Sequence, residues 1–183
     1  MNPENERESA QSLAQLSFFN GNKILTMFKL RKFKKEDTKV VALLIKNTFK
    51  KFNGNECKER GAVQRYLDIY DLEKKGQKEI LNTFKKTPIF YVAWDEDDIV
   101  GIIRGNPQRI VNLFVDGKNH KKGVGRLLIN KFENEAKKQG SKEIKLRSSL
   151  YAIPFYEKMG YKKTTGIRNF HGLKTCPMKK NLE

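Results

Sequence analysis

The chain has 183 residues and carries 38 Lys and Arg against 21 Asp and Glu, a formal net charge of +17. So basic a balance favours polyanionic partners such as RNA, acidic membranes or phosphorylated cofactors. Hydrophobic residues make up 38% and include 12 Phe, enough for a sizeable core, and the length fits one domain with or without a tail. Composition therefore excludes an intrinsically disordered chain.

Three further classes are excluded by features that the sequence lacks. No apolar run approaches the roughly 20 residues that a membrane-spanning helix needs, so we expect no membrane partner. The first six residues lack the basic start and apolar stretch of a secretory signal. The two cysteines and two histidines stand at no chelating spacing, so we expect neither a disulfide framework nor a bound metal. A reducing cytoplasm is the expected location.

The amino-terminal stretch differs from the rest of the chain. Residues 1–26 are polar and poor in β-branched residues, with only a weak amphipathic pattern over 8–19. Regular alternation of strand and helix patterns begins at Met27. We therefore expect an extension over 1–26, either flexible or a short helix, in front of one domain over 27–183.

Strand and helix patterns then follow one another along the domain. Asp37 or Thr38 can cap the first helix, and Gly140 and Gly160 stop two later ones. Period and turn residues predict strands over 27–33, 89–94, 99–103, 109–115, 144–147, 161–165 and 173–179, and helices over 38–52, 63–70, 80–84, 124–136 and 152–159. The order predicts an α/β (α+β) fold, with three consecutive antiparallel strands in its middle.

A glycine-rich turn joins the strand over 109–115 to the next helix. Gly123 and Gly125 remove side chains where an anion would approach the unpaired N–H groups of the first helical turn. The cationic residues around this turn are Lys118, Lys121, Lys122 and Arg126. Gly-x-Gly alone is equally consistent with a tight turn, and the sequence lacks both the Ser/Thr of a P-loop and the third glycine of a dinucleotide fingerprint.

A second motif follows at 149–161, Ser-Leu-Tyr-Ala-Ile-Pro-Phe-Tyr-Glu-Lys-Met-Gly-Tyr. By itself it predicts a short helix whose Phe155 and Met159 fill the core. Preceded by His-Lys-Lys-Gly-Val-Gly at 120–125, it resembles the GNAT superfamily of N-acetyltransferases. That family has Gln/Arg-x-x-Gly-x-Gly/Ala followed by Asn-x-x-Ala-x-x-Phe-Tyr-x-x-x-Gly-Phe/Tyr. The resemblance covers about residues 27–182 and implies a central mixed, mostly antiparallel sheet of six to seven strands flanked by about four helices.

The resemblance also implies an acyltransferase that moves an acetyl group from acetyl-CoA to a primary amine. Leu113, Phe114 and Val115 would pair through their backbone with the pantetheine arm. Ser149 stands where the family has a cofactor-contacting Asn, and Tyr156 would lie near the thioester sulfur. The segment that would hold the pyrophosphate is His120, Lys121, Lys122, Gly123, Val124, Gly125 and Arg126.

Direct transfer would need a proton for the departing thiolate. Tyr156 is the candidate general acid, since phenol and thiol pKa values of about 10 and 8.5 are well matched, and strand N–H groups near Phe114 could polarise the carbonyl. No general base is assigned, because Glu143 is out of phase with its strand and points away. Candidate acceptor-pocket residues, each with a structural alternative, are Tyr66, Tyr70, Asn112 and His171.

Two other functional classes stay open at this point. The charge alone permits a basic nucleic-acid or ribosome-associated module, although Lys is spread over every helix together with Glu and no aromatic-basic RNA motif is present. A non-catalytic CoA-binding regulator is permitted by Ser149 and by the missing base. We expect an enzyme, monomeric or homodimeric, that acts on a small molecule or a protein amino group and does not bind nucleic acid.

Overall fold

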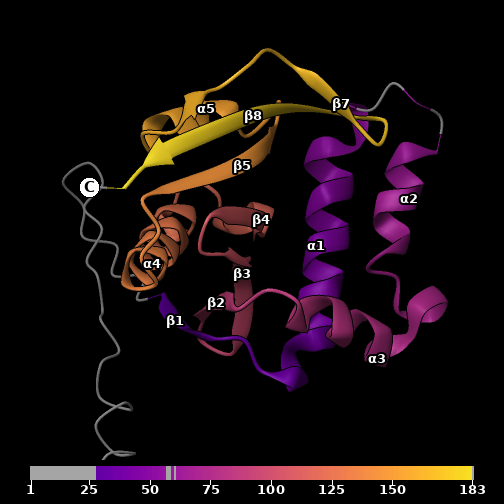
Figure 1. Cartoon of the computed structure of the whole chain (residues 1–183). Helices are drawn as coiled ribbons and strands as arrows, with labels where there is room; N and C mark the ends of the chain where they lie inside the picture. The colour runs from indigo at the N-terminus through magenta and orange to yellow at the C-terminus, as the bar shows by residue number, and fades with distance from the viewer. Residues whose placement is uncertain (1–27, 57–58, 60, 183) are drawn as a thin grey trace, which may run out of the picture.

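A computed structural model describes residues 28–56, 59 and 61–182 (Figure 1). The extension expected over 1–26 and Cys57 lie outside these residues. The strands are β1 (Lys29–Lys32), β2 (Ile89–Asp95), β3 (Asp98–Asn106), β4 (Arg109–Val115), β5 (Glu143–Ser149), β6 (Lys162–Lys163), β7 (Arg168–Phe170) and β8 (Leu173–Asn181). The α-helices are α1 (Thr38–Asn53), α2 (Ala62–Asp68), α3 (Leu72–Lys85), α4 (Val124–Lys138) and α5 (Ile153–Lys158).

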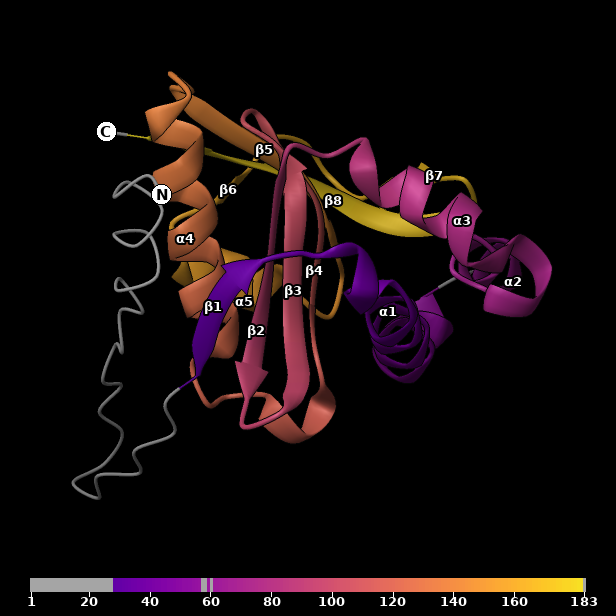
Figure 2. The same ribbon diagram turned by 90° about the horizontal axis from the view of Figure 1, so that it is seen from below.

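One twisted sheet runs through the molecule in the order β1-β2-β3-β4-β5-β8-β6, with β7 paired to β8. All pairings are antiparallel except that between β4 and β5, which are parallel. Helix α4 packs on one face of the sheet and α1 stands against the other (Figures 1 and 2). The predicted fold class is confirmed, with eight strands and five α-helices in the described residues instead of six to seven and about four.

Two hydrophobic cores fill the two faces. The first lies between the sheet and α4 and α5, where the α4 stripe of Leu128, Phe132 and Ala136 is fully buried. The second lies between the sheet and α1 and α3, and includes Ile45 and Phe84. Because each helix has one apolar face, the alternating strand residues divide between the two cores. Strands β2 and β3 contribute to both cores and are therefore covered on both sides, whereas β5 and β8 contribute only to the first core.

Some element bounds differ from the sequence prediction for physical reasons. Helix α3 is 14 residues long, where the sequence predicted a short helix over 80–84, because the chain turns at Gly76 (φ 69) and continues as helix on both sides. Strands β6 and β7 have two and three residues, too few to show a period of two. In the described part of the chain, none of the helices has the length and hydropathy to cross a membrane.

A β-bulge in β4 opens a notch in the middle of the sheet. Arg104 pairs with Asn112 and Gly105 with Ile110, so Val111 is an extra residue on β4. A bulge bends its strand and increases its twist. The ladder joins β4 to β5 at Arg109 and Lys145, near the start of both strands, and no further ladder pair joins them among the described residues. The strands thus separate towards their carboxyl ends, while β5 pairs along its whole length with β8.

Candidate active site in the notch between two strands

The start of α4 presents unpaired backbone donors beside the notch. Its N-cap, Gly123, has φ 92 and supplies no side-chain cap, so the first N–H groups of the helix have no intrahelical acceptor. A Cβ on Gly101 would lie 3.0 Å from Val124 Cγ1, and one on Gly125 would lie 3.1 Å from Phe155 Cζ. These glycines let α4 approach both β3 and α5. The result is a helix N-terminus suited to an anion.

Positive charge surrounds this helix start, as the sequence predicted. The side chains of Lys118, Lys121, Lys122 and Arg126 are exposed around the turn. Lys121 has φ 61, a left-handed conformation that turns the loop sharply ahead of the helix. Lys122 Nζ donates to Asn119 Oδ1 at 3.2 Å, which holds one ammonium close to the loop. The loop therefore combines oriented N–H groups with exposed cationic side chains.

The open edge of β4 exposes the backbone of Leu113 and Val115. Asp116 N donates to Val100 O on β3 at 2.8 Å, and backbone groups of successive strand residues point to opposite sides. Phe114 therefore directs its N–H and C=O towards β3, and its neighbours direct theirs into the notch. His120 Nε2 lies 2.8 Å from Val115 O, and since a carbonyl only accepts, Nε2 carries the proton. Of the three residues predicted here, two offer backbone groups to a ligand.

Aromatic and acidic side chains tie three segments together at the open end of the notch. Phe52 of α1 stacks on His120 and Tyr151, with ring centroids 4.5 and 5.1 Å apart. Glu56, at the end of the short 3-10 helix η2 (Gly54–Glu56), accepts hydrogen bonds from the backbone N–H groups of residues 150 and 151 at 2.9 and 2.6 Å. The turns after β4 and β5 are thereby fastened to the end of α1.

Tyr156 lies on α5 in the floor beneath the separated strands. Only 6% of it is exposed, and its ring packs edge-on against Phe155 and Tyr161 at 5.3 and 5.6 Å. Burial raises the pKa of Tyr156 well above its usual value near 10, so the phenol keeps its proton at neutral pH. Ser149 ends β5 and is half-buried, and its carbonyl accepts from Ser148 Oγ at 2.7 Å.

A buried polar cluster faces the opposite side of β4. Asn112 Oδ1 accepts from Arg104 Nε at 2.7 Å and from the Tyr70 hydroxyl at 3.1 Å, and Asn112 Nδ2 donates to the Tyr66 hydroxyl at 3.1 Å. The Arg104 guanidinium, 4% exposed, also donates to Thr83 O at 3.2 Å and to the Tyr70 hydroxyl at 3.2 Å. Burial raises the pKa of Tyr66.

The structure thus brings together three of the four predicted acceptor-pocket residues. Tyr66, Tyr70 and Asn112 meet in this cluster, whereas His171 occupies the turn between β7 and β8 with φ 53. Sequence reasoning missed Arg104, which donates to both Asn112 and Tyr70. The available signal was an arginine inside the otherwise apolar run of β3, in cross-strand register with Asn112.

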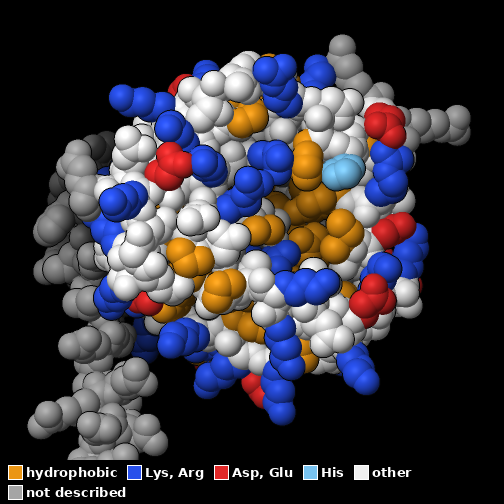
Figure 3. All heavy atoms as spheres, in the orientation of Figure 1, with side chains coloured by type: hydrophobic (Ala, Val, Ile, Leu, Met, Phe, Trp, Pro, Cys, Tyr) orange, Lys and Arg blue, Asp and Glu red, His pale blue; other side chains and the backbone are white. Residues whose placement is uncertain are grey.

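The face that contains the notch is hollowed. Figure 3 shows a depression with hydrophobic walls, and Lys and Arg side chains with one His gather around its rim. Asp and Glu side chains lie towards the periphery of this view. Comparison with Figure 1 places the depression between α1 and the β5–β8 pair. Its charge distribution matches an anionic ligand more closely than a cationic one.

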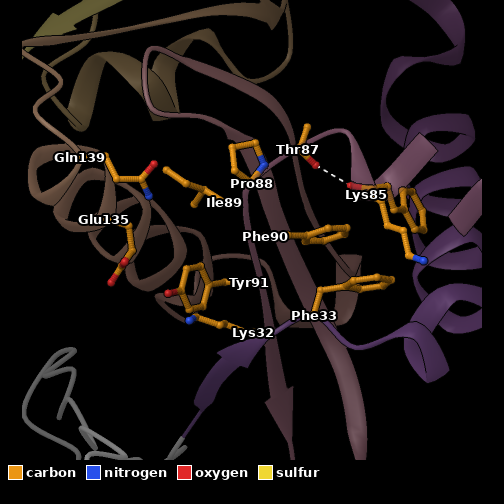
Figure 4. A pocket seen from close by; sticks show the side chains of 11 residues that line it. Lys32, Phe33, Lys85, Thr87, Pro88, Ile89, Phe90, Tyr91, Glu135 and Gln139 are labelled. Atoms are coloured by element: carbon orange, nitrogen blue, oxygen red, sulfur yellow. Dashed lines mark hydrogen bonds between the residues drawn. The ribbon is translucent and has the colours of Figure 1, made fainter. Parts of the chain in front are cut away.

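A second hollow of about 250 Å³ lies at another edge of the molecule (Figure 4). Thr87 and Phe90 lie on the α3 side of it, and Tyr91 and Glu135 on the α4 side. Burial, followed by the neighbouring Glu135 carboxylate, raises the pKa of Tyr91 to about 12. None of its lining residues belongs to the notch, so this hollow is separate from the candidate site.

Comparison with known proteins identifies the family to which the chain belongs. Residues 55–182 match the acetyltransferase (GNAT) domain family. The uncharacterized N-acetyltransferase YvbK of Bacillus subtilis is 30% identical over 105 residues, which cover 52% of this chain and 68% of YvbK. The chain belongs to the GNAT family of N-acetyltransferases. The family and enzyme class that the two sequence motifs predicted are confirmed.

Solved structures support the same fold. A GCN5-related N-acetyltransferase from Rhodopseudomonas palustris superposes with a TM-score of 0.70 at 20% identity, covering 84% of this chain and 94% of that chain. The PaiA N-acetyltransferase from Thermoplasma acidophilum, determined in complex with coenzyme A, superposes with a TM-score of 0.65 at 20% identity, covering 84% and 98%. At 20% identity, this structural likeness establishes the fold alone.

Proposed function

We propose that this protein transfers the acetyl group of acetyl-CoA directly to a primary amine. The observation that carries the proposal is the notch itself, an open β4 edge that leads to the uncapped start of α4. An extended pantetheine arm can pair with the backbone of Leu113 and Val115 as an added strand would. The pyrophosphate can then accept N–H groups of residues 121–126. The coenzyme A complex of the Thermoplasma relative supports this choice of cofactor.

The proposed chemistry divides between β4 and α5. The amine nitrogen attacks the thioester carbon, a C–N bond forms, and the C–S bond breaks. The N–H of Leu113 faces the notch and can donate to the carbonyl oxygen as it gains negative charge. Tyr156 then gives its proton to the departing sulfur, because its buried phenol is neutral at the start of the reaction. The acceptor must reach the notch as a neutral amine, since a protonated amine is not a nucleophile.

Replacing Tyr156 tests the general acid. We expect Tyr156→Phe to lower kcat by 10- to 10⁴-fold, the usual range for a lost general acid, with little change in acetyl-CoA affinity. Tyr161→Phe is the matched control, because it removes a buried phenol oxygen from the same core. Steady-state turnover and calorimetric acetyl-CoA binding should be measured for both variants. Full turnover by Tyr156→Phe would remove this residue from the mechanism.

Two alternative classes are separated by calorimetry combined with an acetyl-transfer assay. Calorimetry with acetyl-CoA and with a generic RNA, at 50 and 200 mM salt, distinguishes a cofactor site from a polyanion site. Micromolar acetyl-CoA binding without salt-steep RNA binding supports the enzyme. Acetyl-CoA binding without transfer to any amine supports a CoA-binding regulator. Tight, salt-dependent RNA binding alone supports a nucleic-acid or ribosome-associated module.

We further propose that residues 27–183 form the acetyltransferase domain and that it works in the cytoplasm as a monomer or homodimer. Strand β1 begins at Lys29 and pairs with β2, so the domain needs the chain from about that point. A protein lacking residues 1–26 should therefore keep its unfolding midpoint and its acetyl-CoA affinity. A large loss of either would extend the domain towards the amino terminus.

A further inference from the structure

The acceptor side of the notch contains few groups that could attract a cation. This side is the sheet face opposite α4 and α5, bordered by α1, α2 and the β7–β8 hairpin. The sequences of α1, β4, β7 and β8 contain neither Asp nor Glu. A Cβ on Gly172 would meet Ala62 Cβ at 2.6 Å, so the tip of the hairpin contacts the start of α2 and closes the far side.

Five described carboxylates on the neighbouring segments are bonded to groups of the protein. Glu56 accepts the two backbone N–H groups of the β5–α5 turn, Glu59 pairs with Arg65, and Asp71 pairs with Lys46. Asp68 pairs with Lys74, and Glu143 pairs with Lys145 and Lys179. A polycationic acceptor would have to displace existing bonds to reach any of these five carboxylates. Most enzymes that hold a cation supply a carboxylate for it.

Arg147 places a positive charge on the acceptor side of the notch. Its neighbours Leu146 and Ser148 point into the core with 4% and 1% exposure, so Arg147 points to the acceptor side of β5. The guanidinium carbon lies 4.2 Å above the ring of Phe170 on β7. Stacking uses the face of the guanidinium and leaves its N–H donors free at the edge. Within the described residues, no carboxylate or other acceptor engages those donors.

We propose that the acceptor is a small amine that also carries a carboxylate, and that Arg147 binds this carboxylate. The proposal rests on the proposed acetyl transfer and adds the class of acceptor. Stacking on Phe170 holds the guanidinium in place, so its paired donors can meet both carboxylate oxygens. Arg104, buried behind Asn112, adds a second positive charge near the reacting strand. Nearby positive charge lowers the pKa of an amine, which increases the neutral fraction without a carboxylate base.

A competition between matched acids and amides tests the acceptor class. The full-length protein receives acetyl-CoA and an equimolar mixture of L-amino acids with the corresponding L-amino acid amides, plus spermidine and a lysine-rich peptide. Mass spectrometry then measures each acetylated product. We expect at least one acid to be acetylated about 10- to 100-fold faster than its amide, the effect of one charged hydrogen-bonded contact. Equal or faster acetylation of the amide, the polyamine or the basic peptide overturns the proposal.

Three variants test whether Arg147 causes the preference for the acid over the amide. Arg147→Gln should reduce the acid-over-amide ratio to near 1 through a higher KM for the acid. Arg147→Lys should restore part of the ratio, since it keeps the charge without the forked donors. Arg109→Gln is the matched control, an exposed arginine at the closed end of the β4–β5 pair. An unchanged ratio in Arg147→Gln overturns the assignment.

Calorimetry separates failure of this proposal from failure of the proposed function. Acetyl-CoA binding together with transfer to amines other than the acids contradicts the acceptor class and leaves acetyl transfer in place. Acetyl-CoA binding without acetylation of any acid in the mixture also contradicts the acceptor class. Absence of acetyl-CoA binding contradicts the proposed function on which the inference rests.

Discussion

Arg31 and Arg147 are both strand residues whose guanidinium groups stack on an aromatic ring, but they differ in their other contacts. Arg31 lies 4.4 Å from the ring centroid of Trp94 and donates to both carboxylate oxygens of Asp37, at 2.6 and 2.8 Å. Arg147 lies 4.2 Å from the ring of Phe170 and has no carboxylate partner among the described residues. The first arrangement fastens β1 to the start of α1. The second stacks at a similar distance but forms no ion pair within the described residues.

A stacked arginine can serve either structure or recognition, depending on whether its donors are already paired. An arginine that is stacked and paired has satisfied most of its donors, and its removal affects stability. An arginine that is stacked and unpaired has its orientation fixed but its donors available, so its removal affects ligand binding. Arg104 represents a third case: its guanidinium carbon also lies over a ring, 5.2 Å from the centroid of Phe84, but the residue is buried and neutral acceptors take the place of the carboxylate.

The largest effect on stability is expected at Arg104. Arg104→Gln should lower the free energy of unfolding by about 2–4 kcal/mol, because it removes the charged donor that Asn112 Oδ1 and Thr83 O share in this buried cluster. Urea titration at pH 7 measures the change. A loss below about 0.5 kcal/mol, the range of ordinary surface substitutions, would show that Arg104 does not hold this cluster together.

An intermediate effect on stability is expected at Asp37, the ion-pair partner of Arg31. Asp37→Asn should cost about 1–3 kcal/mol, since the carboxylate accepts from Arg31 and from Lys34 N at 2.8 Å. Burial alone would raise the pKa of Asp37, but the hydrogen bonds from Arg31 and Lys34 outweigh it and hold the pKa below its usual value. Turnover per folded molecule should not change. A stable variant with altered acceptor preference would remove the contrast between the two arginines.

The lowered pKa of Asp37 sets the pH range of that stabilisation. A carboxyl with a lowered folded-state pKa stabilises the fold fully above its unfolded pKa of about 3.9, and the stabilisation is lost as pH falls through the folded-state value. The difference in unfolding free energy between wild type and Asp37→Asn should therefore be constant above about pH 5 and shrink below about pH 4. Urea titrations from pH 3 to pH 7 check this. A difference that grows on acidification would contradict the ion pair.

The smallest stability effect is expected at Arg147. Arg147→Gln should change the free energy of unfolding by less than about 0.5 kcal/mol, as is usual for an exposed residue without a specific polar partner. The same urea titration applies, and the Arg109→Gln protein serves again as the reference. Destabilisation comparable to that of Asp37→Asn would identify Arg147 as a structural residue and would count against its proposed role in acceptor binding.

Much of the fold follows from local patterns in the sequence. The apolar stripes of α1 and α4, the acidic turn between β2 and β3 and the glycine after α4 are strong local signals, and each element lies where they predict it. The bulge at Val111 was not predictable, because it depends on the register of two strands that the sequence does not specify. The kink at Gly76 was missed because a glycine in a lysine-rich segment resembles the end of a helix.

Some parts of the candidate site are likewise predictable from the sequence, and others are not. The glycine loop and the Phe-Tyr motif each occupy one continuous segment, so the sequence locates them directly. The roles of Arg104 and Arg147 depend on side chains distant in the sequence, Tyr70 for Arg104 and Phe170 for Arg147. The Glu56 contact with the turn after β5 spans 94 residues or more and has no local signal. Tertiary neighbours, not propensities, define these positions.

The hydrogen bond between His120 and Val115 has a practical consequence for spectroscopy. An amide of a bound pantetheine arm would compete with the imidazole for the same carbonyl oxygen, so occupancy of the notch should alter the chemical shifts of the His120 ring. The chain contains two histidines, and the other is in the β7–β8 turn on the acceptor side. A histidine-labelled sample would thus give two imidazole signals, one that reports on the cofactor and one that reports on the acceptor.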